Sequence, residues 1–357
     1  MTIPNGHFFE VLPDGRYHFR FDHHLINDFN TCDRYFMFRH MPSAVVDGTP
    51  KVYRPKVGDK FKTSCGSWWS RVMELFYHEM SHLERGIAPG FQLMQKFASD
   101  AWQDLDMERF ASLPPDDKQR QNFDAFGGAT GALQMALEYY QSYALADASA
   151  WKIISTEKGF GLRDEVFLGE DDKVIVHYMG KPDMVVYDYA SSEIVPLDFK
   201  TKDRIQSNVN SLWKPHPQTT GYIVAINDII DQIQSPTLGV SIKRPTTRCF
   251  IRLCARLRPT DKPRNGVRAP RFVTCYPNYS LEELEEWKKT ILAKARRLRL
   301  AIESNEFIPR ESACHLFYNG CDFRRVCSLS PSVRHVALKA DFVQVEPWKP
   351  YEVDDDD

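Results

Sequence analysis

The sequence of 357 residues has no run of eighteen apolar residues, so a membrane-spanning helix is not expected. Its first seven residues contain no basic residue at the start and no apolar stretch, so we expect no secretory signal. The predicted location is therefore the cytoplasm. Neither an internal repeat nor a Gly/Ser-rich linker divides the chain. These absences leave an ordinary globular protein without contact with a membrane as the expected class.

The residues that are present can build a substantial core. Hydrophobic residues make up 43% of the chain and charged residues 26%, with 23 Phe, 15 Tyr and 7 Trp, which excludes global disorder. The net charge of −2 hides an asymmetry, because the last four residues are acidic and residues 243–271 hold ten Lys or Arg against one acid. This basic stripe predicts either a phosphate-binding surface or a solvated hairpin, and the sequence leaves both open.

Hydrophobic periodicity predicts an α/β or α+β fold in which helices precede and follow a mostly β core. Helices are expected at 66–82, 100–112, 120–148, 217–235 and from Ser280 onward, and strands at 152–157, 165–168, 174–178, 184–187, 193–199, 247–255 and 271–276. We therefore divide the chain into a helical region at 1–150, a core with the basic loop at 151–277, a C-terminal helix with clustered cysteines at 278–330 and an extension at 331–357.

Two acids and a lysine stand at the ends of neighbouring predicted strands. Asp198 and Lys200 are two residues apart, so their side chains share one face of a strand, and pairing of the two strands as a hairpin would bring Asp183 beside Asp198. Two carboxylates, with the backbone carbonyl of Phe199 as a third oxygen, suit Mg²⁺ or Mn²⁺. Lys200 would position or deprotonate a water molecule that the metal activates.

The segment from Pro182-Asp183 to Asp198-Phe199-Lys200 resembles the signature of PD-(D/E)XK nucleases. The later Gln218 and Tyr222 match the Gln-x-x-x-Tyr element of the RecB-like branch, and on a helix these two side chains would share one face. The resemblance implies a central mixed β-sheet flanked by helices. It also implies that Gln218 and Tyr222 contact DNA or support the lysine.

A helix upstream carries part of another RecB-like pattern, Gly-x-x-x-His-x-x-x-Glu. Gly66, Ser70 and Glu74 occupy this spacing, so Ser70 replaces the histidine that often binds metal in the family. The third protein ligand is therefore open between Glu74 and Glu157, and an exposed helix carboxylate is the alternative reading for Glu74.

Eight cysteines include three within fourteen residues, namely Cys314, Cys321 and Cys327. Close thiolates in a cytoplasmic chain predict metal or cluster ligands rather than disulfides. With Cys32 as a distant fourth ligand, the pattern resembles the iron–sulfur staple of RecB-like nucleases of the AddB and CRISPR-adaptation types. The resemblance implies a 4Fe–4S cluster, and zinc with His315 in place of one thiolate is the alternative.

Taken together, the resemblance implies a metal-dependent DNA nuclease, with exonuclease action and single-stranded DNA or DNA ends as substrate. It places such an enzyme in recombination, repair or phage DNA metabolism, in a bacterial or phage-infected cell. No Gly-x-x-x-x-Gly-Lys-Ser/Thr pattern is present, so unwinding would need a helicase or recombinase partner. The alternative is a weak or inactive nuclease-fold protein that acts as a DNA-binding or interaction module.

Overall fold

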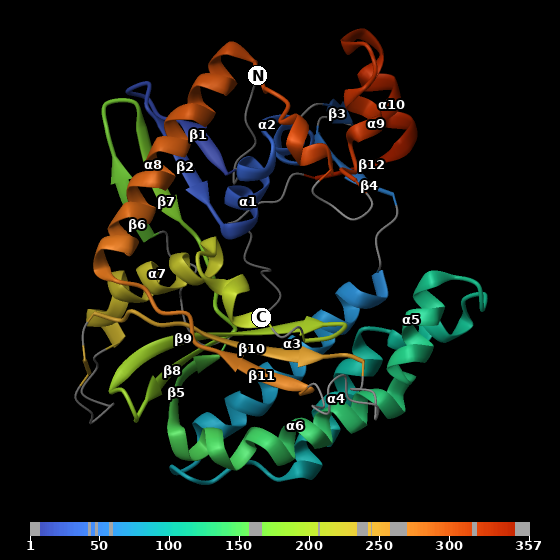
Figure 1. Cartoon of the computed structure of the whole chain (residues 1–357), viewed down its shortest axis with the longest axis vertical. Helices are drawn as coiled ribbons and strands as arrows, with labels where there is room; N and C mark the ends of the chain where they lie inside the picture. The colour runs from blue at the N-terminus through green and yellow to red at the C-terminus, as the bar shows by residue number, and fades with distance from the viewer. Residues whose placement is uncertain are drawn as a thin grey trace. The chain divides into compact units, whose positions relative to one another are not determined.

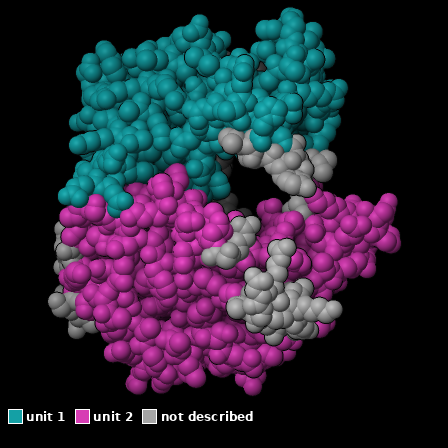
Figure 2. Space-filling view, viewed as in Figure 1, with its two compact units in different colours: residues 1–58, 162–180, 282–357 teal, residues 59–161, 181–281 magenta. Residues whose placement is uncertain are grey.

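The computed structural model describes residues 8–41, 44–46, 49–56, 60–156, 166–205, 208–233, 242–243, 245–257, 270–315 and 320–346. It is a mixed α/β structure, as the periodicity predicted. The chain forms two compact units: unit 1 contains residues 1–58, 162–180 and 282–357, and unit 2 contains residues 59–161 and 181–281 (Figure 2). These units differ from the four consecutive segments expected from the sequence, because each is assembled from separated stretches of chain.

Unit 2 is built on a five-stranded sheet in the order β11-β10-β9-β8-β5 (Figure 1). Its strands are β5 (Trp151–Thr156), β8 (Met184–Asp188), β9 (Glu193–Lys202), β10 (Phe250–Ala255) and β11 (Phe272–Cys275). Strands β9 and β10 are parallel and the other neighbours are antiparallel. Every residue of β8 and β10 is buried, as expected for central strands covered on both faces.

Helices cover both faces of this sheet (Figure 1). Helix α7 (Pro217–Ile233) lies on one side, and α3 (Lys60–Ser81), α4 (Phe91–Asp104) and α6 (Gly128–Ala150) lie on the other. Aromatic side chains fill the second interface, where Tyr77 stacks on Phe199 with ring centroids 5.7 Å apart. Phe199 of β9 therefore points toward α3, so Asp198 and Lys200 point to the opposite face, toward α7.

Two predicted helices have different bounds from those expected. The helix expected at 100–112 ends as α4 at Asp104, and a short 3₁₀ helix, η1 (Met107–Ser112), follows it. The helix expected at 120–148 is divided into α5 (Lys118–Phe126) and α6 by Gly127, whose φ of 93° requires a left-handed backbone. Glycine adopts this conformation at little cost, so it ends α5.

Unit 1 contains a four-stranded sheet in the order β1-β2-β7-β6. Its strands are β1 (Phe9–Val11), β2 (Tyr17–Phe21), β6 (Val166–Glu170) and β7 (Val174–Tyr178), and β2 and β7 are parallel. The sequence placed the β6–β7 hairpin in the central β core. The hairpin pairs with β2 instead, because the buried Phe19 and Phe21 of β2 meet the buried Val176 and Tyr178 of β7.

The remaining elements of unit 1 are helical except for a small second sheet. The helices are α1 (His23–Thr31), α2 (Asp33–His40), α8 (Leu281–Ser304), α9 (Arg324–Cys327) and α10 (Arg334–Asp341), with the 3₁₀ helices η4 (Glu311–His315) and η5 (Pro331–Val333). Strand β4 (Thr49–Pro55) pairs with β3 (Ala44–Val46) and with β12 (Phe342–Val345). In unit 2, η2 (Val209–Trp213) precedes α7. Among the helical residues described, no helix is both long and apolar enough to cross a membrane.

Candidate active site

The two predicted acids meet at one end of the β8–β9 hairpin. These strands are antiparallel, and their last registered pair is Met184 with Leu197. Extending this register by one residue places Asp183 opposite Asp198. The Asp183 Oδ2 atom accepts a hydrogen bond of 2.6 Å from the backbone N–H of Phe199, so the carboxylate is fixed at the end of the hairpin.

Asp198 is the buried centre of the group. It is 1% exposed, and its Oδ2 atom lies 2.6 Å from Nζ of Lys200 on the same strand. The amide nitrogen of Gln218 donates to its Oδ1 atom at 3.1 Å. Burial of a carboxylate is tolerated because a cation and a hydrogen-bond donor hold both oxygens.

Gln218 and Tyr222 occupy one face of α7, as the spacing predicted. The Gln218 amide also donates to the Tyr222 hydroxyl at 2.8 Å, and that hydroxyl donates to the Lys181 carbonyl at 2.9 Å. Since Lys181 precedes Pro182 and Asp183, Tyr222 ties α7 to the segment that carries the first acid. The helix thus fixes both acids relative to each other.

Lys200 is a cation in this arrangement. Burial alone would lower the pKa of its ammonium group, but the nearby Asp198 and Asp183 carboxylates outweigh burial and raise it. This charge state favours positioning of an anion over removal of a proton from water. His216 lies near Lys200. Burial, with smaller contributions from the positive charges of Lys200 and Lys202, lowers the pKa of His216 to about 4.

The Phe199 carbonyl is directed toward the same end of the hairpin. In a strand, the N–H and C=O of one residue point to the same neighbouring strand, and the Phe199 N–H reaches Asp183. The residue opposite Phe199 in the extended register is Pro182, which has no N–H to donate. This backbone direction is compatible with the third oxygen ligand expected from the sequence.

The structure does not bring Glu74 to this group. Its carboxylate pairs with Arg71 of the same helix at 3.0 Å. Among the residues described, the ligand atoms of Glu74, Asp183 and Asp198 do not lie within 4.8 Å of one another. Helix α3 faces β9 near Gly66, where an added Cβ would lie 3.4 Å from the Thr201 hydroxyl oxygen. Glu157, the other candidate, lies outside the described residues.

The described half of the basic stripe is used inside unit 2. Each of its five cations has a carboxylate partner: Lys243 and Arg248 pair with Glu193, Arg252 with Asp147, Arg256 with Asp203 and Arg271 with Glu138. These residues therefore stabilise the unit and do not form a free phosphate-binding surface. The other five cations of the stripe lie outside the described residues, as does the acidic end of the chain.

The four predicted cysteine ligands gather in unit 1. The Cys32 Sγ atom accepts from the backbone N–H of Arg310 at 3.3 Å, and Cys321 donates its backbone N–H to the Cys314 carbonyl at 3.2 Å. Burial, with smaller contributions from the nearby Cys327, Cys314 and Cys32 thiols, raises the pKa of Cys321 to about 11. Cys32, Cys321 and Cys327 pack in one cluster of unit 1 and Cys314 is hydrogen-bonded to Cys321, so the four cysteines lie in one region although 282 positions separate Cys32 from Cys314.

One group near the site was not singled out from the sequence. His216 stands two residues before Gln218, and its only signal was this position in the sequence Lys-Pro-His-Pro-Gln. Cys249 was predicted to be an ordinary buried residue. It is fully buried, and burial together with the Asp198 charge raises its pKa, which keeps the thiol unreactive.

The ligand atoms of Asp22, His23 and His24 also lie within 4.8 Å of one another, in unit 1. Asp22 is the N-cap of α1, where its side chain accepts from the Leu25 N–H at 2.7 Å. A helix N-terminus disfavours a cation, so this group is explained by helix capping.

Comparison with known proteins gives no family for the chain: no protein-family model matches it, and no curated protein matches it either.

Proposed function

We propose that the chain is a metal-dependent deoxyribonuclease that hydrolyses phosphodiester bonds. The observation that supports this proposal is the convergence of Asp183, Asp198, Lys200, Gln218 and Tyr222 into one hydrogen-bonded group at the end of β8 and β9. The residues that match the RecB-like PD-(D/E)XK motifs come from separate elements, β8, β9 and α7, and the fold brings their side chains into contact.

The donor set fits a hard divalent cation. Asp183 and Asp198 would hold Mg²⁺ or Mn²⁺ with the Phe199 carbonyl, since such ions prefer carboxylate and carbonyl oxygens. Two carboxylates and one ammonium group leave a net negative charge at the hairpin end. When bound, the ion would lower the pKa of a water molecule and stabilise charge on the phosphate.

The other residues of the group would orient the reactants. Lys200, as a cation two residues from Asp198, would attract a phosphate oxygen and position the water that attacks it. Gln218 would hold the Asp198 carboxylate in one orientation, and Tyr222 would hold Gln218. We propose DNA as substrate, with single-stranded DNA or DNA ends preferred and a helicase or recombinase as partner, on the strength of the resemblance alone.

We further propose that Cys32, Cys314, Cys321 and Cys327 hold a 4Fe–4S cluster. Burial raises the pKa of Cys321 and of Cys327, so a bound metal would be needed to deprotonate these two thiols, and thiolates select iron–sulfur clusters or zinc over hard ions. A single zinc ion, at about 2.3 Å from each sulfur, is the alternative to the cluster.

A cleavage assay tests the first proposal. Wild-type protein with Mg²⁺ or Mn²⁺ should degrade end-labelled single-stranded DNA, and Asp198→Asn and Lys200→Ala should each lower the rate by several orders of magnitude. Asp188→Asn is the matched control, because Asp188 is at the other end of β8 and binds Ser191. Near wild-type cleavage by Asp198→Asn would reject the assignment, and inactivity of the wild type on all DNA forms would favour the inactive-module alternative.

Metal analysis of protein purified without oxygen tests the second proposal. We expect four iron atoms per chain and a brown colour with iron–sulfur absorption. Zinc in place of iron would reject the cluster and keep the metal staple. Absence of both metals would reject the staple as well.

A further inference from the structure

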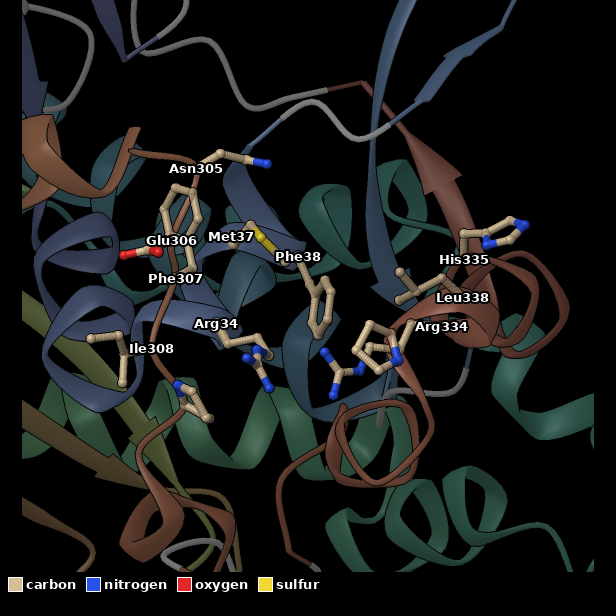
Figure 3. A pocket seen from close by; sticks show the side chains of 12 residues that line it. Arg34, Met37, Phe38, Asn305, Glu306, Phe307, Ile308, Arg334, His335 and Leu338 are labelled. Atoms are coloured by element: carbon tan, nitrogen blue, oxygen red, sulfur yellow. The ribbon is translucent and has the colours of Figure 1, made fainter. Parts of the chain in front are cut away.

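Unit 1 contains a cavity of about 650 Å³ between α2, the segment that follows α8, and α10 (Figure 3). Its floor is apolar and consists of the buried side chains of Phe38, Phe307 and Leu338. Its volume falls in the range of pockets that enclose a small organic ligand. The acids and lysine of the candidate active site belong to unit 2 and take no part in it.

Two arginines line this cavity. Figure 3 shows the guanidinium groups of Arg34 and Arg334 turned toward one another beneath Phe38. Arg334 is held in place, since its Nε atom donates to the Leu329 carbonyl at 3.1 Å and its Nη2 atom donates to the Cys327 carbonyl at 3.2 Å. Burial raises the pKa of the Cys327 thiol, and the nearby charges of Arg34 and Arg334 act in the opposite direction.

Arg34 differs from Arg334 in having no such anchor. In the part of the chain that the structure describes, its guanidinium makes no ion pair and no hydrogen bond. Glu306, the acid that lines the cavity, lies on the far side of Phe307 from both guanidinium groups in Figure 3. A half-buried arginine without a partner, beside a second arginine fixed by the backbone, is an arrangement that favours an anion.

We propose that this cavity binds a nucleoside monophosphate group. The phosphate would lie between Arg34 and Arg334, because the planar guanidinium fork matches phosphate oxygens. The base would lie against Phe38, Phe307 and Leu338, because an apolar floor offers nothing to a bare ion and stabilises a planar ring. The group is either a free nucleotide or the phosphorylated end of a DNA strand, and the second source rests on the proposed nuclease function.

Calorimetric titration of the full-length, anaerobically purified protein tests this site. The Asp198→Asn variant serves as background, so that nucleic acid is not cleaved. We expect dAMP to bind, and deoxyadenosine and inorganic phosphate each to bind at least about tenfold more weakly. Arg34→Ala should weaken dAMP binding about tenfold or more, and Arg34→Lys should weaken it less. Lys339→Ala is the matched control, because Lys339 is exposed on α10 and does not line the cavity.

Oligonucleotides of about ten residues, with and without a terminal phosphate, distinguish the two sources of the ligand. If the protein binds the phosphorylated strand and Arg34→Ala abolishes this binding, the ligand is a strand end. If the protein binds dAMP and neither strand, the ligand is a free nucleotide. The proposal is overturned if dAMP does not bind, if Arg34→Ala binds it normally, if phosphate alone binds as well as dAMP, or if an acidic peptide ending in Phe binds more tightly. DNA cleavage by the wild-type protein in any of these cases would show that the cavity alone was misassigned.

Discussion

Replacement of Lys200 by methionine tests the geometry of the site without relying on catalysis. Lys200 Nζ lies 2.6 Å from Asp198 Oδ2, and its side chain is 32% exposed while that of Asp198 is 2% exposed. Methionine keeps the length of the side chain and removes the charge. Asp198 would then be a buried carboxylate without the ammonium group that pairs with it.

The expected loss of stability follows from this burial. Removing one partner of a buried ion pair costs about 3 to 5 kcal/mol, and the partial exposure of Lys200 to water reduces this to about 2 to 3 kcal/mol. Unit 2, residues 59–161 and 181–281, contains 204 residues. For a unit of this size, the melting temperature should fall by about 4 to 12 °C.

The chain offers a closely matched control. Lys62 lies 2.8 Å from Asp203 and its side chain is 31% exposed, but Asp203 is 44% exposed. Lys62→Met should therefore cost about 1 kcal/mol or less, as surface ion pairs do. The two lysines are similarly exposed, but Asp198 is buried, whereas Asp203 is exposed and also pairs with Arg256.

Thermal unfolding measures the effect, first with EDTA and then with Mg²⁺ in place of EDTA. The proteins compared are the wild type, Lys62→Met, Lys200→Met, Asp198→Asn and the double variant Asp198→Asn/Lys200→Met. We expect a coupling energy of about 1 to 3 kcal/mol between Asp198 and Lys200. Mg²⁺ should stabilise Lys200→Met more than the wild type, because it replaces the missing positive charge. Equal losses for Lys200→Met and Lys62→Met would refute the buried pair.

Three further predictions address other features. Burial raises the pKa of Asp22 to about 7, so its contribution to stability is lost as pH rises through 7. Asp22→Asn retains the helix cap, and its unfolding free energy relative to the wild type should be about 2 to 3 kcal/mol higher at pH 8 than at pH 5. An equal difference at both pH values would contradict this. Tyr222→Phe should lower the cleavage rate about five- to tenfold, because it loses the hydrogen bond to the Lys181 carbonyl, while circular dichroism shows an unchanged fold. Full activity of this variant would show that Tyr222 has no role in the site. Cys32→Ser should lose iron and lower the melting temperature while Cys275→Ser does neither, and iron retained in Cys32→Ser would remove Cys32 from the ligand set.

Local spacing predicted most of the candidate site. Asp198 and Lys200 share a strand face because side chains alternate along a strand, and Gln218 and Tyr222 share a helix face because residues four apart are neighbours on a helix. The β8–β9 hairpin followed from two short apolar strands close in sequence. Such relations depend on backbone geometry over a few residues, so the sequence alone determined them.

Relations between distant segments required the tertiary structure. The sequence left the basic stripe open between a phosphate-binding surface and a solvated hairpin. In the structure, Arg252 is paired with Asp147 and Arg271 with Glu138, each more than 100 positions away. The hairpin of β6 and β7 was predicted correctly, but its assignment to the central sheet was wrong. Strand periodicity does not specify which distant strand pairs with a hairpin.

The same distinction applies to unit 1. The sequence by itself marked Cys32, Cys314, Cys321 and Cys327 as a set through their spacing and a resemblance, and the structure gathers them. Nothing in the sequence connected Arg34 with Arg334, since 300 positions separate them and arginine is common on surfaces. Only the packing of α2 against the segments around α10 decided that both would line one cavity, because burial and charge pairing depend on which distant side chains the fold brings together.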